Sequence, residues 1–480
     1  MKKGIVFLSL FFFFVLAVFS CKNEDVDSRP EQYSLNDLSD PERINKFIVD
    51  VVEEIYLWKS ETDWSKYNTL QTFKDYTDHD KLFEELIYRK DDKWSNLTDD
   101  IAGLENQFAG ISTTFGYTLS FYLLPDKTII AVVLFTSPGS PAEKAGLKRG
   151  DIIVEMNGAA MTEKNYVELY YAPSLVIRCG VLDLQTDIIE PLPETKSITA
   201  VNMYENPIVA YKIIEKGGRK IGYLCYTGYQ IESEKELERI FTRFKSEGVT
   251  EVVLDLRYNP GGYSRTAQIL SSILVPESAV KNKSVYLEHL YNDLYSAYYR
   301  GRGEDLKEYF VDTLSVNMNL ARLYVLTSGI TASASEATIV GLKPYLDLVQ
   351  IGGTTSGKYC GGVLLSPADL YENRNYYTNF SNWGMYIMIY RFFNSTGISS
   401  FTSGLAPAIK VEEDEFDLKP FGDEEDPLLG SALAHMFNKT YVGTRSGKIS
   451  LPVTQLPDIK RPVDGLMIYS PSSLPVFNKK

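Results

Sequence analysis

The sequence predicts a multidomain α/β protein, because three different patterns follow one another along its 480 residues. Apolar residues have helical spacing near the start, short strands separated by turns follow from about residue 108, and strands alternate with helices beyond about residue 195. A chain of this length exceeds one ordinary hydrophobic core. Strands that alternate with helices are typical of a largely parallel, layered sheet.

The composition is that of a folded globular protein, with 44% hydrophobic and 23% charged residues. The formal net charge is −14. Nucleic acid is excluded as an expected partner, because phosphate binding needs a basic face.

The first residues resemble a secretory signal peptide, predicted over residues 1–20. Two lysines precede an apolar run from Ile5 to Phe19, and Ser20 stands before Cys21. Val18-Phe19-Ser20-Cys21 resembles a bacterial lipobox, in which the cysteine becomes the lipidated first residue; the alternative is an ordinary signal peptide with an incidental cysteine. We therefore expect an exported protein of the cell envelope, lipid-anchored at the outer membrane or in the periplasm, with residues 21–31 as a tether.

Residues 32–98 are predicted to form a helical N-terminal domain. Ser39-Asp40-Pro41 has the chemistry of a helix start. The residues behind it have the spacing of one buried helix face: Ile44, Phe47, Ile48, Val51, Val52, Ile55 and Tyr56.

Residues 99–190 resemble a PDZ domain. An apolar strand at 129–135 leads into residues 137–147, where Pro141 opens a short helix and Gly146 ends it, and Asn157-Gly158 is a hairpin signal. Gly116, Tyr117, Thr118 and Leu119 stand where PDZ domains bind a peptide carboxylate while the peptide adds as a strand. A plain strand with one glycine is the alternative for this last stretch.

The α/β core is predicted over residues 195–440, with a C-terminal extension over 441–480. Its expected elements are a hairpin (208–214 and 221–226), helices at 234–245, 263–274 and 333–342, and strands at 252–256, 323–326 and 348–352. Residues 277–320 are expected to form a helical, tyrosine-rich insertion. The acidic run 412–426 is expected to be a solvated loop, with a cation site as the weaker alternative.

Ser333 is the candidate nucleophile. It lies in Thr327-Ser328-Gly329-Ile330-Thr331-Ala332-Ser333-Ala334-Ser335-Glu336, between a strand and a helix. A serine oxygen at a helix N-terminus lies near free N–H groups that favour developing negative charge. Serine is also a common helix cap, so this stretch alone does not decide between the two roles.

Lys358 is the candidate base, in Gly352-Gly353-Thr354-Thr355-Ser356-Gly357-Lys358 after the next strand. A serine nucleophile needs a group that accepts its proton. The chain has three histidines, none of them within a motif. A lysine serves as base where burial lowers its pKa enough to leave the amine neutral.

A glycine pair supplies the third part of the predicted site. Gly261-Gly262 ends Leu254-Asp255-Leu256-Arg257-Tyr258-Asn259-Pro260-Gly261-Gly262, after a buried strand. One of their N–H groups, paired with the N–H of Ala334, would form an oxyanion hole. A turn before a helix is the alternative.

Together these motifs resemble the C-terminal processing (tail-specific) serine peptidase family with a PDZ domain, and the chain is similar to its bacterial lipoprotein members. The likeness covers roughly residues 100–435. It places Ser333 on the nucleophile and Lys358, 25 positions later, on the general base. Ala334 and the glycine pair fall on the oxyanion positions. The resemblance implies a crotonase-like (ClpP-like) α/β spiral core, and cleavage of proteins near their C-termini without metal or cofactor.

One residue departs from the family pattern. The family carries a glutamine four residues after the lysine, where this chain has Gly362. Another group must therefore orient Lys358, or the activity is weak. The alternative function is a catalytically weak or inactive envelope lipoprotein that binds peptides through its PDZ-like domain.

Apart from Cys21, the cysteines are Cys179, Cys225 and Cys360. They have no metal-like spacing, and the sequence does not decide whether two of them form a disulfide.

Overall fold

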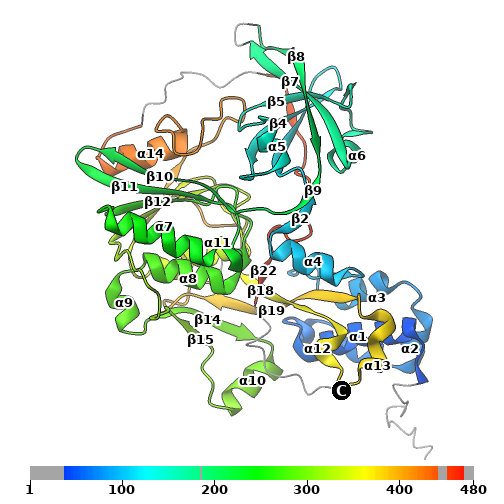
Figure 1. Ribbon diagram of the computed structural model, residues 1–480. Helices are drawn as coiled ribbons and strands as arrows, with labels where there is room; N and C mark the ends of the chain where they lie inside the picture. Colours follow the sequence, from blue (N-terminus) through cyan, green and yellow to red (C-terminus); the bar gives the residue numbers. More distant parts are fainter. Residues whose placement is uncertain (1–36, 184–185, 400, 442–450, 470–480) are drawn as a thin grey trace, which may run out of the picture.

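The computed structural model describes residues 37–183, 186–399, 401–441 and 451–469. The predicted signal peptide and Cys21 lie outside these residues, so both stay predictions. Within the described part of the chain, no helix is long and apolar enough to cross a membrane. Figure 1 shows a helical region, a β-rich region and an α/β region.

The helical region contains α1 (Asp40–Ile55), α2 (Leu70–Asp75) and α3 (His79–Leu86). The backbone N–H of Ser39 donates to the Glu42 carboxylate at 2.7 Å, which caps the start of α1. This region is continuous with the α/β region. Strand β1 (Asn96–Thr98) pairs antiparallel with β19 (Gly384–Phe393).

The β-rich region is a sheet of seven strands in the order β21-β3-β4-β5-β7-β8, with β6 paired to β5. Its strands are β3 (Tyr117–Leu123), β4 (Ile129–Thr136), β5 (Ile152–Met156), β6 (Ala159–Ala160), β7 (Ser174–Asp183), β8 (Ile188–Thr199) and β21 (Thr454–Gln455). Helices α5 (Pro141–Lys144) and α6 (Tyr166–Tyr170) complete it. The hairpin predicted at Asn157-Gly158 is confirmed, because both residues have positive φ between β5 and β6.

A two-stranded ribbon joins this region to the rest of the chain. Strand β2 (Ile111–Thr114) enters the β-rich region and pairs antiparallel with β9 (Val201–Tyr204), which leaves it. Helix α4 (Ile101–Phe108) precedes the ribbon. The ribbon therefore connects the β-rich region to both other regions (Figure 1).

The first sheet of the α/β region has six strands in the order β10-β11-β12-β16-β17-β20. They are β10 (Ile208–Lys216), β11 (Arg219–Tyr226), β12 (Glu251–Asp255), β16 (Arg322–Thr327), β17 (Asp347–Gly352) and β20 (Ile409–Lys410). Strands β10 and β11 form the predicted antiparallel hairpin, and the remaining neighbours are parallel, as predicted.

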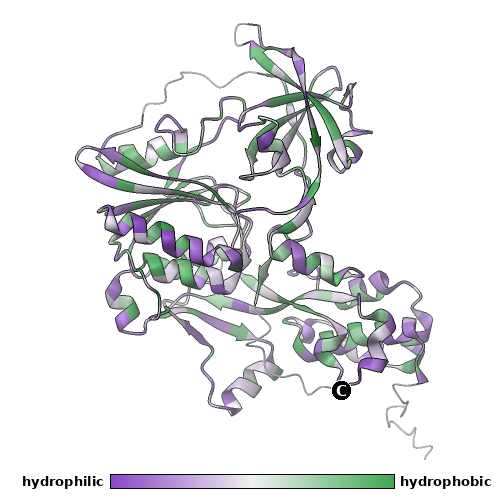
Figure 2. Ribbon diagram, in the orientation of Figure 1, coloured by the Kyte–Doolittle hydropathy of each residue, from purple (hydrophilic) through white to green (hydrophobic). Residues whose placement is uncertain are grey.

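Helices cover both faces of this sheet (Figure 1). Helices α7 (Glu234–Ser246), α8 (Ser264–Leu274) and α11 (Ala334–Leu342) share one apolar cluster with alternate strand residues such as Leu254, and α14 (Pro427–Met436) shares another with Val253. Figure 2 shows hydrophilic and hydrophobic bands along α7, as expected of an amphipathic helix with one buried face.

A second sheet lies under these helices, in the order β13-β22-β18-β19-β14-β15. Its strands besides β1 and β19 are β13 (Gly262–Tyr263), β14 (Val285–Tyr291), β15 (Lys307–Tyr309), β18 (Cys360–Leu365) and β22 (Met467–Ile468). Strand β22 comes from the C-terminal extension and begins 102 positions after the end of β18.

The prediction of a helical insertion at 277–320 is wrong in part. Helices α9 (Glu277–Lys281) and α10 (Asp293–Gly301) are short; β14 lies between them, and β15 follows α10. Tyrosines at helical spacing belong to α10 alone. Residues 288–291 of β14 pair with β19 instead, so tertiary packing decides the structure.

The prediction of a solvated acidic loop at 412–426 is also wrong in part, because Glu412, Glu424 and Glu425 are exposed whereas other carboxylates of the run pair with buried arginines. Glu413 and Asp426 pair with the buried guanidinium of Arg257, at 2.5 and 2.8 Å. Arg149, from the β-rich region, contacts the same Glu413 carboxylate. Asp255 completes the group with a contact to Arg257 at 2.7 Å. These carboxylates therefore neutralise buried arginines, and they join the β-rich region to the α/β region.

Candidate active site

Ser333 lies at the junction between β16 and α11, where the sequence predicts it. Its backbone has φ +62°, a value that non-glycine residues adopt rarely. The residue is fully buried. Its hydroxyl faces the start of α11 but has no hydrogen-bond partner of good geometry among the described residues. A strained backbone and an unpaired buried hydroxyl are both typical of a functional position.

Glu336 holds the Ser333 loop and the Lys358 loop together. One carboxylate oxygen accepts the backbone N–H groups of Ser333 and of Lys358, both at 2.8 Å. The other oxygen accepts the N–H of Gly357 at 2.7 Å and the hydroxyl of Thr355. Burial raises the pKa of Glu336, and these donors oppose that rise. A single carboxylate therefore places the two predicted catalytic residues side by side.

The side chain of Lys358 is fully buried. Its Nζ donates to the phenol oxygen of Tyr386 at 3.2 Å and lies 5.2 Å from the ring centroid of Trp94. Burial lowers the pKa of Lys358 to about 8. The amine is thus far easier to deprotonate than an exposed lysine. No hydrogen bond joins it to the Ser333 hydroxyl in this structure.

The predicted oxyanion residues lie against the serine. A Cβ added to Gly261, which has φ +118°, would stand 2.9 Å from the Cβ of Ser333, so only glycine fits there. The N–H of Gly261 donates to the Asn259 side chain at 2.9 Å, and the N–H of Gly262 donates to the carbonyl of Leu466 at 3.0 Å. Ala334 is the first residue of α11, where backbone N–H groups have no intrahelical partner.

Tyr386 contacts Lys358 in this chain, which has Gly362 in place of the family's glutamine. A Cβ added to Gly362 would meet the Cζ of Tyr386 and the carbonyl oxygen of Ile387, each at 2.7 Å. The phenol accepts from Lys358 and donates to the carbonyl of Met467 at 2.6 Å. Space for a longer side chain at residue 362 is therefore absent, and Tyr386 is the group in contact with the amine.

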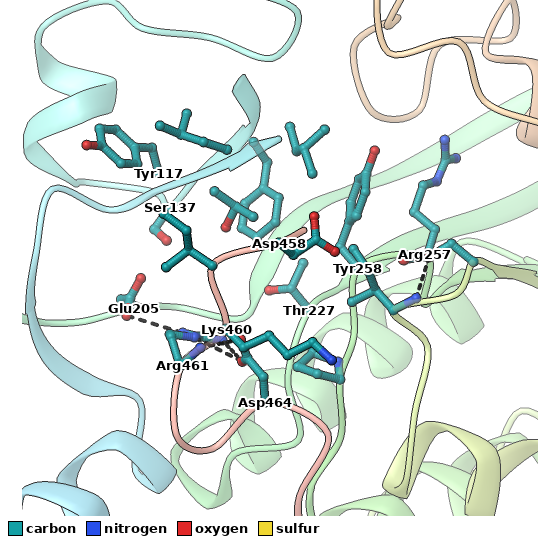
Figure 3. Close-up of a pocket in the computed structure, with 18 of the residues that line it drawn as sticks. Tyr117, Ser137, Glu205, Thr227, Arg257, Tyr258, Asp458, Lys460, Arg461 and Asp464 are labelled. Atoms are coloured by element: carbon teal, nitrogen blue, oxygen red, sulfur yellow. Dashed lines mark hydrogen bonds and ion pairs between the residues drawn. The ribbon is translucent and has the colours of Figure 1, made fainter. Parts of the chain in front are cut away.

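The predicted peptide-binding residues lie at the edge of a cavity between the β-rich region and the α/β region. Gly116, with φ +73°, precedes β3, and its N–H donates to the Thr114 hydroxyl at 2.9 Å. Tyr117, Thr118 and Leu119 line a cavity of about 1040 Å³. Figure 3 shows Tyr117 and Ser137 on one side of it and Arg257 and Tyr258 on the other.

The same cavity approaches the candidate catalytic residues without reaching them. It is lined by Pro260, next to the glycine pair, by Ala332, next to the serine, and by Ser356, two residues before the lysine. Ser333 and Lys358 do not. In this conformation the cavity and the buried dyad are adjacent but separate.

Two contributors were not identified from the sequence. Glu336 stands in the quoted serine motif, three residues after Ser333, and that capping-box spacing was the available signal. Tyr386 has no local signal, because it reaches Lys358 only through the pairing of β18 with β19. The three cysteines within the described residues, Cys179, Cys225 and Cys360, are buried and free of disulfides.

Comparisons with known proteins agree with these motifs. Residues 220–411 match peptidase family S41, residues 43–96 match the peptidase S41 N-terminal domain, and residues 136–172 match a PDZ domain. The chloroplastic C-terminal processing peptidase of Tetradesmus obliquus is 25% identical over 327 residues, which cover 65% of this chain and 63% of that protein. The carboxyl-terminal-processing protease of a Picosynechococcus strain is 25% identical over 248 residues, 51% of this chain and 54% of that protein.

A solved structure from Bacteroides fragilis NCTC 9343, assigned to the S41 proteases, has a TM-score of 0.67 and 26% identity, and the match covers 82% of this chain and 97% of that one. The matched part spans less than two thirds of the length of either curated relative. Together these findings support placing the chain among the S41 peptidases with a PDZ domain. Its fold is multidomain α/β, with a helical N-terminal segment, a PDZ-like domain and an S41 peptidase core.

Proposed function

We propose that this chain is a serine endopeptidase that cleaves exported proteins or peptides near their C-termini, with Ser333 as nucleophile and Lys358 as general base. The observation that carries the proposal is the Glu336 carboxylate, which accepts both backbone N–H groups at 2.8 Å and so fixes the two residues together. Burial of both side chains, and the pKa of about 8 for Lys358, suit an amine that must accept a proton.

The reaction follows from these positions. The Ser333 hydroxyl rotates towards Lys358, gives its proton to the neutral amine and attacks the scissile carbonyl carbon. Negative charge then develops on the carbonyl oxygen, next to the N–H of Ala334 at the start of α11 and one N–H of the glycine pair, which must first leave the acceptor it has in this conformation. Lys358 returns the proton to the leaving amine, and an acyl-enzyme remains. Water, deprotonated by the same lysine, releases the acyl group and restores the serine.

Tyr386 takes the orienting role that the family assigns to the glutamine absent at Gly362. Its hydroxyl accepts from the lysine amine at 3.2 Å, and its own proton is directed to the Met467 carbonyl. The lone pair that Tyr386 offers therefore fixes the amine without competing for the proton that Lys358 must accept. Substrates bind through the PDZ-like domain, where an apolar free C-terminus would add beside β3 near Gly116 and Tyr117.

The N-terminal sequence extends the proposal to location. Cleavage before Cys21 and its lipidation would place the enzyme on an envelope membrane, with protein or peptide substrates in the same compartment. Cys21→Ala is expected to move the protein from the membrane fraction to the soluble fraction of the envelope. A variant that stays fully membrane-bound would contradict lipid anchoring.

Cleavage of an unfolded reporter protein with a free C-terminus tests the proposed activity. Ser333→Ala is expected to abolish cleavage while the fold and the peptide binding stay those of the parent. Ser335→Ala is the matched control: its hydroxyl is equally buried and donates to the Asn259 carbonyl at 3.0 Å, so it loses about 1 kcal/mol of stability and little activity. Full activity of the Ser333→Ala protein, or equal losses in the two variants, would contradict the proposal.

A further inference from the structure

Residues 454–469 contact both the candidate active site and the edge of strand β3 in the PDZ-like domain, which we call the PDZ-like edge. Strand β21 adds to the outer edge of β3 in antiparallel register, with Thr454 opposite Leu123 and Gln455 opposite Tyr122. The N–H of Leu456 continues the ladder to the carbonyl of Phe121 at 2.8 Å. Because β3 begins directly after Gly116, this segment runs towards the predicted carboxylate-binding loop. Its direction and edge are those of a peptide bound by strand addition.

The middle of the segment follows the wall of the cavity. Leu456 and Ile459 pack against the apolar cluster of the PDZ-like domain. Arg461 pairs with Asp464 at 3.0 Å and with Glu205 at 3.5 Å, as the dashed lines in Figure 3 show. Figure 3 also places Lys460 beside Arg461 at the cavity. The segment thus leaves the PDZ-like edge and crosses towards the serine.

The end of the segment occupies groups that the proposed chemistry needs. Strand β22 lies between β13, which begins at the oxyanion candidate Gly262, and β18, which begins two residues after Lys358. The Leu466 carbonyl accepts from Gly262 at 3.0 Å, and the Met467 carbonyl accepts from Tyr386 at 2.6 Å. Leu466, Met467 and Ile468 are almost completely buried. The segment therefore binds the N–H of Gly262, which is a candidate oxyanion donor. It also binds the hydroxyl of Tyr386, which contacts the candidate base Lys358.

We infer that residues 454–469 are an internal pseudo-substrate, which occupies the peptide-binding track from β3 to the glycine pair and keeps Ser333 inaccessible. The inference rests on the proposed function. It identifies the ligand class of the track as an extended peptide with apolar side chains, like Leu466, Met467 and Ile468, bound through its backbone. A substrate must displace this segment before Ser333 reacts.

Rates of Ser333 modification by a small fluorophosphonate test the inference in the full chain. Met467→Asp puts a charge into a buried strand position, which favours release of β22. We expect modification roughly tenfold faster or more, because release shifts the population from the closed to the open state. Met436→Asp, at a buried methionine of α14 away from the track, is the matched control and is expected to give no increase. A folded Met467→Asp protein that reacts no faster than the parent would overturn the inference.

A synthetic peptide with the sequence of residues 453–469 supplies a second test. It is expected to bind the Met467→Asp chain and slow its modification, but not to bind the parent, whose track is already occupied. Failure to bind the folded Met467→Asp chain would overturn the inference. If neither chain were modified at Ser333 but the peptide bound only the Met467→Asp chain, the proposed catalysis would be wrong. The inference that residues 454–469 occupy the track would still hold.

A milder variant covers the case in which Met467→Asp does not fold. Arg461→Ala removes two ion pairs at a half-exposed position and leaves β22 intact. We expect about a twofold to threefold faster modification, in line with the small value of exposed ion pairs. Arg302→Ala, which removes an exposed contact to Glu304 at 2.6 Å, is the control. An unchanged or slower rate for Arg461→Ala would count against the inference.

Discussion

The PDZ-like edge and the serine–lysine site differ in how they are exposed. Residues 117–119 line a cavity of about 1040 Å³, whereas Ser333 and Lys358 are fully buried and line none of it. The start of β3 is thus open to the cavity in the same conformation in which the proposed chemistry is closed, while β21 pairs with the far end of that strand. Recognition and reaction are therefore expected to be separate steps, and changes at the two places should have different signatures.

The two places also differ in what holds them. The catalytic side is fixed by a buried carboxylate with several donors, which makes it sensitive to single changes. The recognition side depends on backbone edges and apolar contacts, which tolerate side-chain changes better. Catalytic variants should therefore lose rate at unchanged peptide affinity, and recognition variants the reverse.

The largest expected effect is at Lys358. Lys358→Arg and Lys358→Met should each lower kcat/KM by about a thousandfold, because neither side chain accepts the serine proton at neutral pH. Lys343→Arg, at an exposed position just after α11, is the control. Cleavage assays with the reporter protein provide the measurement. A Lys358→Arg enzyme that works at close to the parental rate would show that this lysine is a structural cation.

Glu336→Gln should have the next largest effect. The amide keeps the size of the side chain, but its NH₂ group replaces a carboxylate oxygen that accepts backbone N–H groups. Those N–H groups lose their acceptor, which costs about 1–3 kcal/mol of stability. We expect kcat to fall about tenfold to a hundredfold, since 1.4 kcal/mol corresponds to a factor of ten. Glu234→Gln, where a partly buried carboxylate accepts from Thr266 at 2.8 Å, is the control. Equal losses of kcat in the two variants would remove the special role of Glu336.

Tyr386→Phe should lower kcat about tenfold, because the amine loses its one oriented acceptor. The hydrogen bond to Tyr386 stabilises the charged amine, so its removal should lower the pKa of Lys358 further. The pH range over which the cleavage rate rises, called here the pH–rate limb, should then move to lower pH. Tyr390→Phe, at another buried tyrosine of β19, should leave the limb in place. A Tyr386→Phe enzyme with an unmoved limb and normal kcat would contradict the orienting role.

The smallest expected effect concerns the PDZ-like edge. A peptide with a free carboxylate should bind a Ser333→Ala/Met467→Asp protein, in which the track is free, several-fold more tightly than its amidated twin, a difference of about 1 kcal/mol. Gly116→Ala should reduce this preference, because φ +73° strains an L-residue and its Cβ would stand 2.3 Å from that of Ser140. Gly139→Ala, with φ +76° and open space around it, is the control. Equal affinity for the two peptides would leave the PDZ-like domain without carboxylate recognition.

Much of the fold was predictable because its signals are local. The strand–turn–helix junction at Ser333 and the hairpin at Asn157-Gly158 follow from residue types within a few positions, and the structure has both. The fold class is confirmed at the level of its three regions and the S41 core. The domain bounds, the spiral description of the core and the roles of the site residues stay predictions.

What the sequence did not reveal depends on pairing between distant segments. Tyr386 contacts Lys358 because β18 and β19 are neighbours, and Leu466 reaches Gly262 from more than 200 residues away. Glu413 belongs to a run that looks solvated, and only the buried Arg257 explains its position. Gly362→Gln, which would introduce the glutamine of the family pattern, is not expected to raise the rate, because a Cβ there meets backbone and ring atoms at 2.7 Å.

The most direct test of the serine–lysine assignment is the pH dependence of fluorophosphonate modification at Ser333. In the parent chain, the rate should rise tenfold per pH unit and level off above an apparent pKa of about 8, the value to which burial lowers Lys358. In Lys358→Met this limb should vanish and the rate should stay low at every pH. If the same limb near that pKa persisted in Lys358→Met, the proton would go to another group and the assignment of Lys358 as base would be wrong.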